Sequence, residues 1–117
     1  MRLMKGAFLV VERGRPEWKQ LFDFEAYDYG PFDRRLYDAR DELVCTGLLD
    51  VTPGRYEQYT VSAAGDQRVA DLTKHLGSDA EWIRQIGHYV TTRSFSRLLG
   101  EIYSAYPEYQ ERSVFRP

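Results

Sequence analysis

The sequence predicts a single α+β domain that is mainly helical, and three observations support this prediction. Apolar residues recur at helical spacing in several separate segments. A Pro-Gly turn signal divides two short segments rich in β-branched and aromatic residues, which is typical of a β-hairpin. The elements follow one another as helix, short helix, long helix, hairpin and further helices. This order is typical of a winged helix-turn-helix with a small β-hairpin wing and a C-terminal helical extension. We assign the core with its wing to residues 1–62 and the extension to residues 63–117.

The N-terminal part begins with a helical pattern over residues 3–11, and Gly14 follows where a helix commonly ends. Pro16 begins a short helical piece. Residues 22–29 then alternate apolar and acidic side chains, which indicates an extended segment with one buried face. In this segment the rings of Phe22, Phe24 and Tyr29 are expected to fill the core.

The long helix is predicted from Pro31 to Thr46, directly before Gly47. Asp33 supports its beginning and is expected to face outward. Cys45 is expected to be a small buried hydrophobic residue rather than a nucleophile. The apolar stripe of this helix consists of Phe32, Leu36, Ala39, Leu43 and Val44.

The hairpin is predicted around Pro53-Gly54, with strands at 48–52 and 55–61. The junction Tyr59-Thr60-Val61-Ser62-Ala63-Ala64-Gly65 resembles the passage that leaves the wing in many winged-helix regulators. Tyr59 and Val61 would point into the core, Ser62 would cap the next helix, and Gly65 would allow close packing.

Three helices are predicted after the hairpin. The first ends at Gly77, the second begins at Ser78 and is interrupted at residues 91–93, and the last begins at Ser94. Their apolar residues could form a homodimer interface or pack back on their own domain; they are Trp82, Ile83, Ile86, Phe95, Leu98, Leu99, Ile102 and Tyr103.

Composition restricts the class of protein. The chain has 117 residues, and its apolar runs are all shorter than the roughly 18 residues that span a bilayer, so we expect no membrane contact. The N-terminal apolar run lacks the cleavage site of a signal peptide, and Cys45 is the only cysteine. We therefore expect a cytoplasmic protein without a disulfide.

No residue pattern in the sequence indicates catalysis. His75 and His88 fall on different predicted helices without ligand or base partners, and no phosphate-binding glycine loop is present. We expect neither an enzyme, nor a bound metal, nor a cofactor.

DNA binding is one of two functions that the sequence leaves open. The predicted helix 31–46 has the place of a recognition helix, and the turn at 53–55 has the place of a wing tip. Acidic side chains on the same helix face oppose this function, because residues 21–62 carry four bases and nine acids. The residues that would contact an operator are Arg34, Arg35, Tyr37, Arg40 and Arg55.

Recognition of a protein partner is the interpretation we favour. The aromatic and acidic segment 22–29 combines large contact area with charge, as protein interfaces do. An acidic surface would fit a basic partner. The expected anchor residues are Tyr27, Asp28, Tyr37 and Tyr56.

Short motifs in the first half of the chain resemble the Panacea (SocA-like) family of antitoxins and proteolysis adaptors. The first helix carries Leu3, Lys5, Phe8 and Leu9, and residues 24–37 contain Tyr29-Gly30-Pro31 between an aromatic, acidic segment and a helix. The resemblance implies a role as a neutralising protein or an adaptor, with a toxin or a protease system as the partner. Many antitoxins also repress their own operon, so the resemblance is compatible with both functions.

Overall fold

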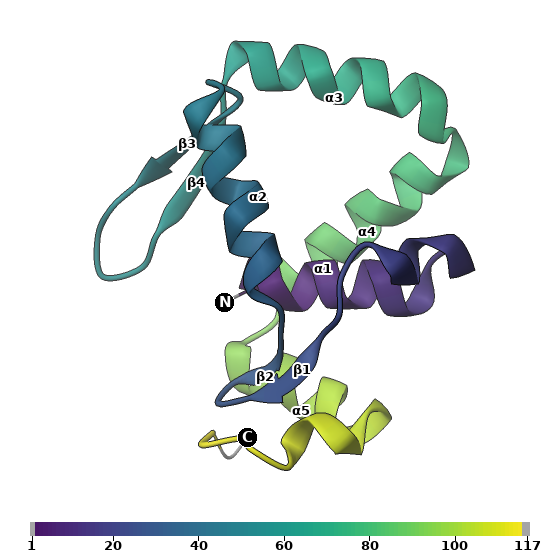
Figure 1. Ribbon diagram of the computed structural model, residues 1–117, viewed down its shortest axis with the longest axis vertical. Coiled ribbons are helices and arrows are strands. Elements are labelled where there is room, and N and C mark those ends of the chain that lie inside the picture. Colours follow the sequence, from purple (N-terminus) through teal and green to yellow (C-terminus); the bar gives the residue numbers. More distant parts are fainter. Residues whose placement is uncertain (1, 116–117) are drawn as a thin grey trace. The chain divides into compact units, whose positions relative to one another are not determined.

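The computed structural model describes residues 2–115, and Figure 1 follows the chain through them. The chain divides into two compact units, which we describe separately. The terminal unit consists of residues 1–36 and 83–117, and the central unit consists of residues 37–82. The predicted border at residue 62 falls inside the central unit.

The described residues form five α-helices and two antiparallel β-hairpins, so the predicted class, α+β and mainly α, is confirmed. None of these helices is long and apolar enough to cross a membrane. The elements in chain order are α1 (Arg2–Arg13), η1 (Pro16–Gln20), β1 (Glu25–Tyr27), β2 (Gly30–Phe32), α2 (Arg34–Cys45), β3 (Leu49–Thr52), β4 (Gln58–Val61), α3 (Ala63–Leu76), α4 (Ser78–Thr92), α5 (Phe95–Ala105) and η2 (Pro107–Gln110).

The core of the terminal unit lies between α1 and α5. Phe8 is fully buried, and the rings of Phe24, Tyr106 and Tyr109 meet it edge-on at centroid distances of 5.3, 5.1 and 4.9 Å. The buried cluster consists of Phe8, Leu9, Val90, Leu98, Leu99, Ile102 and Tyr103. The apolar face of α5 therefore packs on its own unit, which is the second of the two roles that the sequence left open.

The β1–β2 hairpin corrects the predicted beginning of the long helix. Pro31 lies in β2 opposite Ala26, and the helix begins only at Arg34. Gly30 has a positive φ of 92°, and a Cβ there would lie 3.2 Å from the Leu99 side chain. The Nζ of Lys5 donates a hydrogen bond to the Pro31 carbonyl at 3.1 Å. Strand pairing and this contact with α1 hold Pro31 in the extended conformation.

Asp33 caps α2. It was predicted to face outward, but it is buried, with 8% of its surface exposed. Its carboxylate accepts hydrogen bonds from the backbone N–H of Arg35 at 2.9 Å and of Asp23 at 2.6 Å. A short acidic side chain before a helix satisfies N–H groups that have no partner within the helix. The contact with the Asp23 backbone, ten residues earlier, holds the Asp33 carboxylate inward.

The junction between the wing-like hairpin and α3 has the predicted cap and glycine, but Val61, which was expected to point into the core, is exposed. In β3 and β4, Leu49 pairs with Val61. Ser62 Oγ accepts from the Gly65 N–H at 3.0 Å and donates to the Gly47 carbonyl at 2.6 Å. A Cβ on Gly65 would overlap the Leu48 carbonyl oxygen. Ser62 therefore caps α3, and the absence of a side chain at Gly65 lets α3 rest on the base of the hairpin (Figure 1).

The central unit buries much less than the sequence predicts. No residue of α2 is buried, Leu43 and Val44 are 43% and 40% exposed, and Val61 is 45% exposed. Cys45 is also exposed, so its expected burial is wrong. Of residues 37–82 only Gly65 and Ala80 are buried. Of the predicted apolar stripe, Phe32 lies in β2, Leu36 is half-buried, and Ala39, Leu43 and Val44 are exposed, so the stripe does not form a buried face of α2.

The predicted helix ends in the C-terminal part agree closely with the structure. Gly77, with φ of 59°, closes α3, and Ser94 caps α5 through the Arg97 N–H at 3.2 Å. The predicted interruption at 91–93 is shorter, because α4 continues through Thr92.

Candidate protein-interaction surface

Tyr27 combines exposure with a fixed orientation. Its side chain is 44% exposed and stacks on Phe32 with ring centroids 4.9 Å apart and planes at 29°. The guanidinium of Arg112 lies 5.5 Å from the centre of the Tyr27 ring. Neighbouring side chains already restrict the ring. Little further conformational entropy would therefore be lost when a partner covers it.

Tyr29 lies in the β1–β2 turn, next to Asp28, and was expected to fill the core. Its ring contacts Phe95 and Phe115, with centroid distances of 6.3 and 6.2 Å, yet 39% of its surface remains exposed. Phe22 and Phe24, by contrast, are half-buried, and Phe24 packs against the core cluster. Side chains of residues 22–29 therefore alternate between half-buried and exposed, as the sequence predicts, but Tyr27 and Tyr29 lie on the exposed side.

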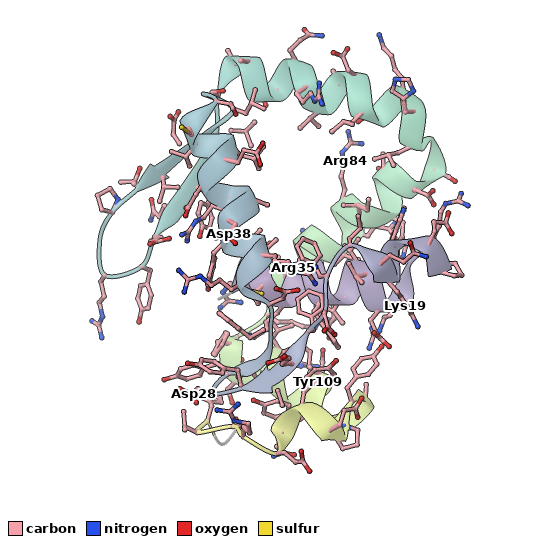
Figure 2. All side chains as sticks on the ribbon, viewed as in Figure 1. Lys19, Asp28, Arg35, Asp38, Arg84 and Tyr109 are labelled. Carbon is pink, nitrogen blue, oxygen red and sulfur yellow. The ribbon has the colours of Figure 1, made fainter. Side chains whose placement is uncertain are left out.

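The C-terminal segment fixes the turn at Asp28, which Figure 2 shows at the end of the β1–β2 hairpin. The Asp28 carbonyl accepts hydrogen bonds from the Val114 N–H at 2.9 Å and from Ser113 Oγ at 3.3 Å. Tyr103 Oη, at the edge of the core, donates to Ser113 Oγ at 2.6 Å. A chain of contacts thus joins the turn to α5.

These residues form one patch, which we call the turn surface: Tyr27, Asp28, Tyr29, Arg112 and Val114. Val114 is 66% exposed and directly follows the hydrogen-bonded Ser113. The sequence did not indicate Arg112 or Val114, because they lie about eighty residues from the hairpin in the chain and follow no motif. Two exposed carboxylates, Asp23 and Glu25, continue the patch along the approach to β1.

Arg40, an expected DNA contact, is instead held within the central unit. Its guanidinium pairs with Asp41 at 3.0 Å and with Glu57 at 3.2 Å, and it lies 4.6 Å from the centre of the Tyr37 ring. A hydrogen bond to Tyr59 and the bond to Asp41 raise the pKa of Arg40. Only 20% of the Arg40 side chain is exposed. The cluster connects α2 to β4, which is a structural role.

Burial raises the pKa of the Tyr37 hydroxyl, and the ring is half-buried under Arg40. Tyr56, in the loop between β3 and β4, is 76% exposed, and the Arg55 guanidinium lies 5.6 Å from its ring centre. Of these two expected partner anchors, Tyr56 is thus the accessible one.

Arg35 forms an ion pair with Asp33 at 2.8 Å. This bond is the main reason why the pKa of Asp33 is lowered to about 2, and the same bond raises the pKa of Arg35. Arg34 is exposed. The exposed neighbours of these arginines on α2 include Asp38, Asp41 and Glu42, so the helix surface carries carboxylates beside its cations.

The expected residues are divided between the two units. Tyr27 and Asp28 belong to the terminal unit, whereas Tyr37 and Tyr56 belong to the central unit. The expected DNA contacts are divided in the same way, with Arg34 and Arg35 in one unit and Tyr37, Arg40 and Arg55 in the other. The turn surface collects several side chains of the terminal unit.

Within residues 2–115 no three His, Cys, Asp or Glu side chains are grouped so that they could hold a metal ion. His75 and His88 are both exposed, on α3 and α4.

Fold and surface together define a small α+β protein, mainly helical, with a preorganised aromatic patch at a hairpin turn. No protein-family model, curated protein or solved structure matches the chain.

Proposed function

We propose that this chain is a non-enzymatic regulatory module that recognises a protein partner through the turn surface. The observation that carries the proposal is Tyr27, which is 44% exposed while it is stacked on Phe32. Tyrosine supplies a large contact area, and a ring that is already ordered loses little entropy on binding. Tyr29 and Val114 extend the apolar part of the same surface.

The charge of this surface suggests the partner's chemistry. The segment 22–29 contributes Asp23, Glu25 and Asp28, and Arg112 is the basic side chain of the turn surface. An excess of carboxylates around exposed aromatic rings is complementary to a basic protein surface, and it favours the encounter with such a partner. A basic toxin or a component of a protease system, as the Panacea resemblance implies, would fit this description.

The winged-helix arrangement is part of the same proposal. Helix α2, the β3–β4 hairpin and the capped start of α3 follow one another as the recognition helix, the wing and the next helix do in that fold. We propose that the fold is retained here as a scaffold for binding a protein.

DNA recognition is the weaker candidate, because two of the five expected contacts are engaged within the chain. Arg35 and Arg40 pair with Asp33, Asp41 and Glu57. Binding a phosphate would require these pairs to open or would bring carboxylates close to the phosphate, and either lowers affinity. Arg34 and Arg55 would then have to supply most of the attraction.

The proposal is tested with a partner isolated by affinity purification on the full chain and then purified itself. Calorimetric titration should show that Tyr27→Ala weakens binding at least about tenfold, which corresponds to about 1.4 kcal/mol. Leu21→Ala is the matched control, because Leu21 is 59% exposed in the same unit but outside the turn surface. Its affinity should equal that of the wild type.

The DNA candidate is tested in parallel by fluorescence anisotropy on the gene's own upstream DNA and on scrambled DNA, across a salt series. We expect no sequence-selective binding. Selective binding that weakens steeply with salt and is lost in Arg34→Ala/Arg55→Ala would refute the proposal in favour of DNA recognition.

A further inference from the structure

The Tyr27 ring lies between another ring and a cation. Glu25 pairs with Phe32 across the hairpin, so Phe32 lies on the same face as Tyr27, because side chains alternate along each strand. Gly30 lies opposite Tyr27 and leaves room for its ring to stack on Phe32, with centroids 4.9 Å apart. The Arg112 guanidinium lies over the Tyr27 ring, 5.5 Å from its centre. Since Phe32 covers one face of the ring, Arg112 occupies the other.

The Arg112 side chain can leave the ring without any movement of the main chain. Backbone hydrogen bonds fix the segment around it: the Ser113 N–H donates to the Gln110 carbonyl at 3.0 Å, and the Val114 N–H donates to the Asp28 carbonyl at 2.9 Å. The Arg112 side chain itself is exposed, and a cation over a ring at an exposed site is a weak contact. Arg112 is therefore a tethered and replaceable occupant of the ring face.

The charges around the ring favour a cation from outside. Residues 22–35 and 107–115 carry twice as many acids as bases; the acids are Asp23, Glu25, Asp28, Asp33, Glu108 and Glu111, and the bases are Arg34, Arg35 and Arg112. Arg35 is paired with Asp33 at 2.8 Å. Glu25 is exposed and lies on the same face of the hairpin as Tyr27. An incoming cation would be attracted by these carboxylates and repelled by Arg112, so the two cations exclude each other on the ring.

We propose that an arginine side chain of the partner binds over the Tyr27 ring in place of Arg112, so that Arg112 competes with the partner. This inference rests on the proposed role of the turn surface, and it adds the chemical group that this surface takes. Arginine fits better than lysine, because its planar guanidinium stacks on aromatic faces and can bind a carboxylate such as Glu25 through two hydrogen bonds. Removal of Arg112 should therefore strengthen binding, whereas it would weaken binding if Arg112 contacted the partner itself.

An amidated tetra-arginine peptide is the probe, and the NMR signals of the Tyr27 ring in the full chain follow its titration. Arg112→Gln should bind the peptide about two- to fivefold more tightly, which is about 0.5–1 kcal/mol. Lys19→Gln is the control for net charge, because it removes the same charge from a side chain that is 56% exposed, outside the turn surface. Its effect should be smaller in about 0.15 M salt, which screens distant charges. A tetra-citrulline peptide, which has the same shape without the charge, should not bind.

Two substitutions of Tyr27 test the role of the ring. Tyr27→Phe keeps the aromatic face and should bind the peptide as the wild type does. Tyr27→Leu keeps an apolar side chain without a ring, and it should bind about two- to fivefold more weakly. In the free chain the ring should also shift the signals of the Arg112 δ-methylene protons. That shift should disappear as the peptide saturates the chain. Circular dichroism confirms that each variant is folded.

The inference and the proposed function fail in different ways. Tetra-arginine binding that is absent, or that Arg112→Gln leaves unchanged or weakens, overturns the inference, as does an Arg112 shift that persists at saturation. The proposed function fails if Tyr27→Ala leaves the affinity for the purified partner unchanged. If Tyr27→Ala and Arg112→Gln both weaken binding of that partner, the turn surface stands, but Arg112 is part of the contact and the competition is refuted.

Discussion

Replacement of Lys5 by methionine should stabilise the protein near neutral pH and destabilise it slightly at high pH. Lys5 is 2% exposed, and its Nζ donates to the Pro31 carbonyl at 3.1 Å. Burial lowers the pKa of the Lys5 amine from 10.5 to about 8. Between these values the unfolded chain binds more protons than the folded chain, so stability rises with pH across this window. Below about pH 8 the folded protein bears the full cost of the buried charge.

The lowered pKa corresponds to about 3 kcal/mol against the folded state at pH 7. Methionine has a similar shape and removes this cost, but it also removes the hydrogen bond to Pro31, which is worth about 1 kcal/mol. We therefore expect Lys5→Met to raise the free energy of unfolding by about 2 kcal/mol at pH 7. Near pH 10.5 most of the charge cost is gone, and the variant should be about 1 kcal/mol less stable than the wild type.

Urea unfolding at the two pH values measures this change of sign. Trp18 fluorescence in a Trp82→Phe background reports on the terminal unit, which contains Lys5. Lys19→Met is the control, because the Lys19 side chain is 56% exposed, and its effect should be small at both pH values. An equal destabilisation by Lys5→Met at pH 7 and at high pH would show that the buried amine carries no charge cost, and would refute the reasoning.

The other predictions concern positions where the structure gives a direct physical reason. In thermal unfolding followed by circular dichroism, Gly65→Ala should destabilise the fold by about 1–3 kcal/mol, because the added carbon would overlap the Leu48 carbonyl. Gly87→Ala adds a carbon with nothing within 4 Å of it, and it should stabilise the fold by about 0.5–1 kcal/mol. Ser62→Ala should cost about 1 kcal/mol in the same assay, since the cap of α3 is lost; no loss would contradict the cap. Asp33→Asn should cost about 1–2 kcal/mol in urea unfolding at pH 7, because Arg35 and two backbone N–H groups favour the charged carboxylate. Since the pKa of Asp33 is lowered from 3.8 to about 2, that contribution should disappear as the pH falls through this interval, and a difference that persists at pH 2 would contradict the assignment.

The local features that the sequence predicted well depend on neighbouring residues. The end of α3 at Gly77, the cap of α5 at Ser94 and the hairpin before Ser62 all follow from contacts within a few residues of the chain. Caps, turns and helical periodicity are such local effects.

Features that depend on distant segments were missed or assigned wrongly. Pro31 was assigned to a helix by its local preference, but pairing with Ala26 and the contact with Lys5 hold it in a strand. Asp33 was expected outside and is buried, because it accepts from the backbone N–H of Asp23, ten residues earlier. In both cases a tertiary contact outweighs a local preference that is worth only a fraction of a kcal/mol to about 1 kcal/mol.

The candidate surface shows the same division. The sequence by itself determined that Tyr27 and Asp28 belong to an aromatic, acidic segment with a period of two, because side chains alternate along any extended chain. Only the tertiary structure decided that Phe32 and Arg112 hold the Tyr27 ring in an exposed position. It also decided that Arg40 pairs with Glu57, seventeen residues later in the chain. Contacts between residues this far apart in the chain leave no periodic pattern, since they depend on how whole elements pack.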